Sequence, residues 1–323
     1  RSRVRIRRTT TSVTTKAAIP TADQIAWKVQ LPTIGHSSPV IWGQHLFVTS
    51  ATEGGSERFM HCLDAASGKQ LWNASFTMEA SRKHQKNSWA SSTPCTDGRV
   101  VCGLFADAKQ LVAKAWDFSG TELWSVELGS YESEHNLGVS PIIEDGLVLI
   151  ANDQVGPSSF IALQADTGTV AWKTERQPGT TSYSTPTVTA DGAGGKQIVC
   201  VSESGGVSGI DLKSGKALWQ TPKLPMRTVA SPIVMDGLAF ATHHEDLIEL
   251  ELGARVGGQA LNDEDIARRH PILLPTCLND CVHDKTVPIG RRGTYRPRPF
   301  LSTRGFASLP KPLTRPDRRF RPK

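Results

Sequence analysis

The sequence predicts an all-β protein made of repeated four-stranded antiparallel sheets, and three observations predict it. A polar turn phrase that ends in tryptophan occurs four times, and the tryptophans are 52, 48 and 47 residues apart. A second phrase, Ser or Thr followed by proline, alternates with the first. Asp-Gly pairs, a strong signal for a tight hairpin, follow several of these prolines. A period of this size is typical of stacked units that cannot bury their apolar faces alone.

One repeat shows the expected strands in order. The segments "SPIIE" and "LVLIAN" lie on either side of Asp145-Gly146, and "FIALQ" and "TVAWKT" lie on either side of "ADTG". Gly168 in the second turn can adopt a positive φ without steric cost. Two hairpins in series, repeated about every 45 residues, predict a β-propeller blade, and the β-branched, glycine-punctuated pattern excludes a helical solenoid.

The turn phrase has a clear structural role if it closes the outer hairpin of a blade. Its copies are "LDAASGKQLW", "WDFSGTELW", "LQADTGTVAW" and "IDLKSGKALW". An indole buries on the order of 200 Å² and offers an N–H donor, so one per blade can fix blade spacing. We therefore expect the seams between blades to contain a set of blade-docking residues, namely Trp27, Trp72, Trp124, Trp172, Trp219, Gly68, Gly120, Gly168 and Gly215.

The Ser/Thr-Pro phrase suits the inner side of a blade. It occurs in "SSPVIWGQ", "STPCTDGR", "SPIIEDGL", "STPTVTADG" and "SPIVMDGL". Proline is tolerated at the first residue of a strand, where no ladder donor is needed. Its small neighbours allow the inner strands to crowd toward an axis.

Charge is distributed unevenly along the chain. The formal net charge is +6, yet residues 27–246 contain 16 Lys and Arg against 22 Asp and Glu, so the basic excess lies in the flanks. Arginine-rich ends bind any polyanion loosely, and no recognition motif accompanies them, which argues against a specific nucleic-acid partner. No apolar run approaches membrane-spanning length, and no signal peptide is visible.

At this point the sequence resembles the PQQ-like repeat family, whose blades carry a docking phrase of the form A-x-D-x-x-T-G-K-x-x-W. The resemblance covers residues 25–242. It implies a propeller fold and an exported, periplasmic setting. The family includes quinone-dependent alcohol and sugar dehydrogenases, an outer-membrane assembly lipoprotein that binds partner proteins without a cofactor, and propellers attached to bacterial serine/threonine kinases.

The repeats define the expected domains. Residues 1–24 form a basic segment expected to be disordered, residues 25–246 form the propeller repeats, and residues 247–323 form an Arg/Pro-rich tail, also expected to be disordered. Family propellers usually have seven or eight blades, and about five repeats are visible here. Either the Trp27 strand closes a five-bladed ring, with 247–252 completing the last blade, or the chain is an incomplete ring. We favour the incomplete ring, with a truncation or frame shift near residue 246.

A dehydrogenase of this family would hold PQQ with Ca²⁺ in a central channel, with an Asp as general base. Many such enzymes add a disulfide between adjacent cysteines, and no two cysteines are adjacent here. Four cysteines lie singly in strand-like stretches and are expected to be small buried hydrophobes: Cys62, Cys95, Cys102 and Cys200. Cys95 and Cys102 flank a turn, so a disulfide between them is open in an oxidising compartment.

The most function-like stretch is the polar loop "SRKHQKNSWASSTP" at 81–94. Its side chains are expected at a channel mouth, close to a polar triplet of the next unit, as a ligand site for a metal or an anion: His84, Asn87, Ser88, Trp89, Glu134, His135 and Asn136. The alternative is a loop whose polar groups satisfy its own backbone. Residues 243–246 lie where the repeat decays, and the set Cys277, Cys281 and His283 lacks the second ligand pair of a zinc site, so neither is predicted to bind a metal.

The leading functional hypothesis is a non-catalytic scaffold that presents a rigid propeller face to a protein partner or a small ligand, without a cofactor. The first alternative is a degenerate PQQ-dependent dehydrogenase. The second is a sensor propeller related to kinase systems, although the chain itself contains no kinase signature.

Overall fold

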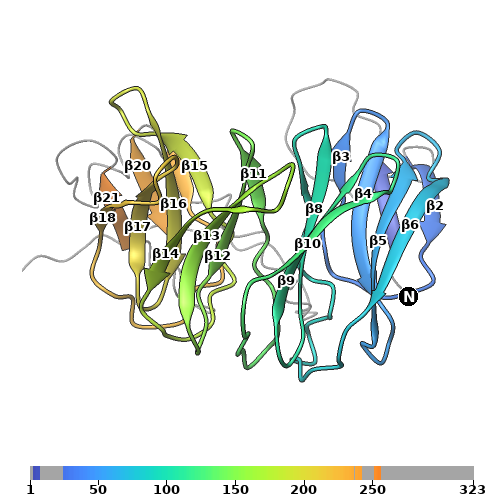
Figure 1. Ribbon diagram of the computed structural model, residues 1–323, viewed down its shortest axis with the longest axis horizontal. Coiled ribbons are helices and arrows are strands. Elements are labelled where there is room, and N and C mark those ends of the chain that lie inside the picture. The colour runs from blue at the N-terminus through green and yellow to red at the C-terminus, as the bar shows by residue number, and fades with distance from the viewer. Residues whose placement is uncertain (1–2, 8–24, 236, 242–250, 256–323) are drawn as a thin grey trace, which may run out of the picture. The chain divides into compact units, whose positions relative to one another are not determined.

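The computed structural model describes residues 3–7, 25–235, 237–241 and 251–255, all of which belong to one compact unit, Arg1–Arg269. These residues form strands and turns and contain no helix (Figure 1). No helix among them is long and apolar enough to cross a membrane.

Four sheets each contain four antiparallel strands that pair in chain order, as the repeats predict. The first comprises β3 (Val40–Trp42), β4 (His45–Ala51), β5 (Glu57–Asp64) and β6 (Gln70–Thr77). The second comprises β7 (Cys95–Thr96), β8 (Val100–Ala106), β9 (Leu111–Asp117) and β10 (Glu122–Glu127). The third comprises β11 (Ile142–Glu144), β12 (Leu147–Asn152), β13 (Ser158–Gln164) and β14 (Val170–Arg176). The fourth comprises β15 (Thr187–Ala190), β16 (Lys196–Ser202), β17 (Gly206–Asp211) and β18 (Ala217–Gln220).

Two smaller sheets flank these four. One pairs β1 (Arg3–Arg7) with β2 (Ile25–Gln30), and the other contains β19 (Ile233–Met235), β20 (Leu238–Ala241) and β21 (Glu251–Arg255). Strand β1 lies in the segment for which the sequence predicts no strand. Since β2 pairs with β1 and not with the last sheet, the sheets do not close on one another within the described residues. The frame shift expected near residue 246 lies outside those residues.

The position of a strand within its sheet decides how it is buried. The second strands are buried along almost their whole length, as β8 shows, because both of their faces pack against other sheets. The fourth strands alternate between exposed and half-buried residues, as in β6. The largest apolar cluster joins residues of the second, third and fourth sheets and includes Trp124. The core therefore lies in the seams between sheets.

Each outer turn forms one half of a docking contact. The indole of Trp124 lies against Gly168 of the next sheet, and its N–H donates to the carbonyl of Ala165 at 2.8 Å. The same contact repeats along the chain, where the indole N–H of Trp27, Trp72 and Trp172 donates to the carbonyl of Ala65, Phe118 and Leu212, respectively. Those three indoles lie against Gly68, Gly120 and Gly215.

Trp219 differs from the expectation of a contact with the turn of a following sheet. Its N–H donates to Gln197 Oε1 at 2.7 Å, and its ring lies over Gly209, both in its own sheet. The physical reason is that no further turn phrase follows Trp219 to supply a glycine and a carbonyl.

The Ser/Thr-Pro phrases form a second contact between sheets, which the sequence did not predict. The backbone N–H of Thr93 donates to Ser140 Oγ of the next sheet at 2.9 Å. Equivalent bonds run from Ser38 to Thr93, from Ser140 to Thr185 and from Thr185 to Ser231. Each hydroxyl precedes a proline, so the residue that starts an inner strand also joins two sheets.

Candidate ligand-binding site

Four successive loops, each leading from the last strand of one sheet to the first strand of the next, place polar side chains together. They contribute His84, His135, Tyr183 and Arg227 in chain order. Since the seams fix neighbouring sheets, they also fix the starts and ends of these loops.

The two histidines are held by backbone contacts. Their rings stack with centroids 4.8 Å apart and planes 11° apart. The side-chain amide of Asn87 donates to the carbonyl of His135 at 2.7 Å and to that of Leu137 at 3.2 Å. The stacked pair is therefore preorganised by the loop at 84–87.

Arg227 is the third component, and its guanidinium is positioned on three sides. Its Nη2 donates to Glu134 Oε2 at 2.7 Å, and its Nη1 lies 3.1 Å from His135 Nε2. The guanidinium carbon lies 5.9 Å from the ring centroid of Tyr183. Because a guanidinium can only donate, His135 Nε2 accepts this bond, and a neutral imidazole then carries its proton on Nδ1.

Two adjoining hollows result. The loop pocket has a volume of about 240 Å³ and is lined by residues that include His84, Lys86, His135, Tyr183, Arg227 and Val229. The outer recess has a volume of about 510 Å³ and is lined by Arg82, Lys83, His84, Gln85, Glu134 and His135. Four fixed cations face the two hollows and only one carboxylate does, so their field favours an anion.

The other residues predicted for this site hold the loops in place. Asn136 is buried with φ of 73°, and its amide donates to Ser81 Oγ at 2.6 Å. Ser88 is buried and shares a hydrogen bond with Ser91. The half-buried Trp89 donates to the carbonyl of Ser81 at 2.8 Å. The structure thus brings His84, Asn87, Glu134 and His135 to the hollows. The other three predicted residues, Asn136, Ser88 and Trp89, do not line them.

Sequence reasoning missed Arg227 and Tyr183. Both lie in a loop that leads to a Ser/Thr-Pro phrase, as His84 and His135 do. The four residues stand at different distances from the proline, so no fixed position in the repeat indicated them.

The donor set does not suit the calcium–quinone pair of the dehydrogenases. Ca²⁺ takes six to eight oxygen ligands, whereas the one carboxylate lining these hollows, Glu134, pairs with Arg227. Across the described ranges, no three His, Cys, Asp or Glu side chains come together as metal ligands.

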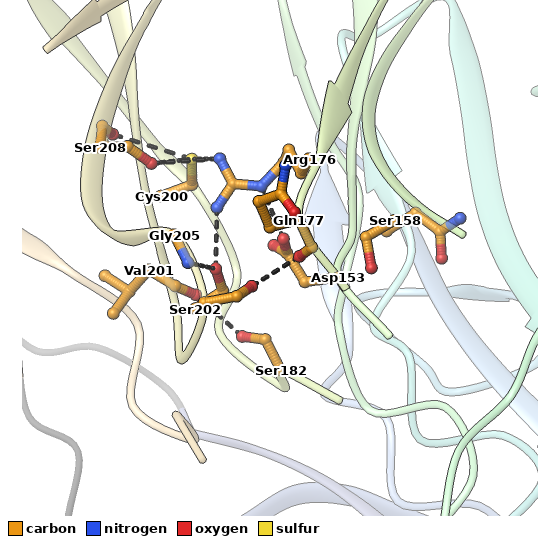
Figure 2. Close-up of polar contacts among 12 residues, drawn as sticks. Asp153, Ser158, Arg176, Gln177, Ser182, Cys200, Val201, Ser202, Gly205 and Ser208 are labelled. Carbon is orange, nitrogen blue, oxygen red and sulfur yellow. Dashed lines mark hydrogen bonds and ion pairs between the residues drawn. The ribbon is translucent and has the colours of Figure 1, made fainter. Parts of the chain in front are cut away.

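A second polar cluster is buried between the third and fourth sheets (Figure 2). Arg176 Nε donates to Asp153 Oδ1 at 2.6 Å, and the other guanidinium nitrogens donate to Ser202, Ser208 and Cys200. Burial acts to lower the pKa of Arg176, but Cys200 and Asp153 outweigh it, so the net pKa lies above its ordinary value. Each guanidinium nitrogen thus has a partner within the protein, and the cluster joins two sheets.

All four cysteines in the described part of the chain are free and buried. Burial raises the pKa of Cys62 to about 12, so it is a neutral thiol at physiological pH. Cys95 and Cys102 are directly opposite each other on β7 and β8. A disulfide between them stays a prediction for an oxidising compartment.

The comparisons with known proteins identify the family. The model of the family described as outer membrane protein assembly factor BamB matches residues 57–275. The chain belongs to the BamB-like PQQ repeat family. No curated protein sequence matches the chain.

A solved BamB structure has the same fold as this chain. BamB from Moraxella catarrhalis is 18% identical with a TM-score of 0.50, and the match covers 72% of this chain and 66% of that one. A europium-containing methanol dehydrogenase is 12% identical with a TM-score of 0.46, over 63% of this chain and 46% of the enzyme. A quinohemoprotein alcohol dehydrogenase from Comamonas testosteroni is 13% identical with a TM-score of 0.44, over 65% and 40%. The chain thus spans just under two thirds of the BamB structure and less than half of either enzyme.

Proposed function

We propose that this protein is a non-catalytic scaffold that binds a protein partner at its inter-sheet loops in an exported, periplasmic setting. The observation that carries the proposal is the convergence of four loops on a cationic hollow in which the only carboxylate is held by Arg227. Such a site can bind and orient a ligand. It offers neither a free carboxylate as general base nor an oxygen-rich metal site for oxidation of an alcohol.

The seams support this role because they make the loops rigid. Each docking contact buries an indole and satisfies its N–H, and each Ser/Thr-Pro phrase adds a hydrogen bond between sheets. A binding surface on rigid supports loses less conformational entropy when a partner binds. The family description, outer membrane protein assembly factor, is consistent with a protein that acts by binding other proteins.

Reconstitution tests the proposal. The full chain is incubated with PQQ and Ca²⁺, and the reduction of a dye is followed with alcohols and sugars as substrates. We expect no turnover above that of free PQQ, while cross-linking captures a specific partner. Turnover would establish the dehydrogenase alternative instead. The kinase-related alternative stays a prediction from the resemblance alone.

A further inference from the structure

We infer that the loop pocket binds a carboxylate of an acidic peptide segment, with Arg227 as the residue that receives it. The inference rests on the proposed function and specifies the chemistry of the partner. Its starting point is the imbalance of charge around the two hollows.

Arg227 has the geometry that such a ligand requires. Only 22% of its side chain is exposed, so a ligand bound there is partly removed from water, which strengthens a charged hydrogen bond. Its Nε is buried and has no hydrogen-bond partner among the described residues. Since Arg227 already donates to a carboxylate of this chain, Glu134, the site shows by its own contacts that it accepts this group.

The surroundings favour a peptide over a small organic acid. Met226 and Val229 lie beside Arg227 in the chain, and both are about half exposed, at 48% each. Val229 also lines the loop pocket. Apolar side chains next to a cationic pocket match a segment in which acidic and apolar residues alternate. Arg82 and Lys83 around the outer recess extend the cationic surface along such a segment.

The ion pair between Glu134 and Arg227 predicts opposite changes in affinity for the two variants. Glu134 is 65% exposed and occupies one arm of the guanidinium. A peptide carboxylate competes with it for that arm. Removal of the Glu134 charge should therefore strengthen binding, whereas removal of the Arg227 charge should weaken it.

The probe is a fluorescein-labelled octapeptide of alternating glutamate and leucine, and its binding to the full chain is measured by fluorescence anisotropy. We expect Arg227→Met to raise the Kd about tenfold or more, as expected for loss of a charged hydrogen bond. We expect Glu134→Gln to lower the Kd several-fold. The matched control is Lys213→Gln, which removes one positive charge from an exposed residue of a distant turn and should leave the Kd unchanged. Circular dichroism shows whether each variant is folded.

Several results would overturn the inference. One is equal binding of a peptide with glutamine in place of glutamate, and another is a Glu134→Gln variant that binds more weakly. Competition by free glutarate at the concentration of the peptide would show that a small organic acid is the ligand. If a cross-linked partner is captured equally by Arg227→Met, the scaffold function stands and the pocket assignment fails, whereas turnover with PQQ would remove the proposed function itself.

Discussion

Gly168 and Gly146 have the same backbone conformation and opposite surroundings. Their φ angles are 71° and 75°, values that an L side chain adopts at a cost of about 1–2 kcal/mol. A Cβ on Gly146 would meet nothing within 4 Å, whereas one on Gly168 would lie 2.7 Å from the indole of Trp124. The two glycines therefore separate backbone strain from the docking contact.

We predict that Gly168→Ala destabilises the protein by about 2–5 kcal/mol, since overpacking adds about 1–3 kcal/mol to the strain. Gly146→Ala should cost only the strain, about 1–2 kcal/mol. Urea unfolding of both variants measures the difference. Equal losses of stability would mean that the indole does not need the glycine.

The buried His61 makes stability depend on pH. Burial lowers its pKa to about 4, from an ordinary value of 6.5. The folded state therefore keeps the imidazole neutral while the unfolded chain takes up a proton below pH 6.5. The contribution of His61 to the free energy of unfolding is fully present above pH 6.5 and is lost as the pH falls toward 4.

We predict that His61 accounts for a loss of about 3 kcal/mol between pH 7 and pH 4, from about 1.4 kcal/mol for each unit of pKa shift. Replacement by glutamine, which keeps a polar group opposite Ser50 and does not titrate, should remove that part of the pH dependence. Urea unfolding of both proteins at the two pH values gives the difference. Parallel pH profiles would contradict the prediction.

At the scale of the element, β14 ends in an ion pair at a position that is apolar in the first two sheets. Arg176 is four residues beyond Trp172, and the equivalent residues of those sheets are Phe76 and Leu128. Phe76 packs against the aromatic rings of Phe105 and Trp116 in the next sheet. The seam can therefore be filled by either an apolar or a paired polar side chain.

We predict that Arg176→Met destabilises the protein by about 3–5 kcal/mol, because Asp153 would remain buried without its partner. The double variant Arg176→Met with Asp153→Asn should recover most of that loss. Arg99→Met, which removes an exposed arginine from its ion pairs, should cost far less, because water screens those pairs. Chemical unfolding compares the three. A double variant no more stable than the single one would assign the loss to packing.

The strands were predictable, and one of their contacts was not. The Asp145-Gly146 turn has positive φ at both residues, as a two-residue hairpin requires, and its flanking alternation indicated β11 and β12. The hydroxyl that precedes each proline gave no such signal. Its role depends on how neighbouring sheets are aligned, which short-range patterns do not encode.

At the scale of the molecule, apolar contacts are concentrated in the middle sheets. The largest cluster joins the second, third and fourth sheets. The cluster between β2 and the first four-stranded sheet and the cluster that includes β20 are both small. In a row of units that contact only their neighbours, stability follows the number of neighbours that each unit has.

We predict that backbone amides exchange most slowly with solvent in β8, β9, β12 and β13, and that those of β19 and β20 exchange at least about tenfold faster. The expectation follows from opening free energies that increase with local packing. Native-state hydrogen exchange followed by mass spectrometry checks it. Uniform protection across all the sheets would indicate a single cooperative unit.

The candidate site was predictable only in part for a reason of scale. His84 and Asn87 share one loop, so the polar stretch indicated them. Arg227 lies 92 residues from His135 in the chain. The two meet because the two seams between their loops hold the intervening sheets in a fixed arrangement. A single sequence contains no signal for contacts over such a distance.

The docking contacts all run in one direction. Apart from Trp219, each docking indole projects onto the sheet that follows it, and each Ser/Thr-Pro amide points the same way. A head-to-tail joint of this kind has no internal stopping point. Deletion of residues 125–172, one whole period, would offer Trp124 the glycine at 215 in place of the one it now covers. The contact between two sheets therefore does not by itself fix how many sheets follow one another, and only closure of a ring would do so.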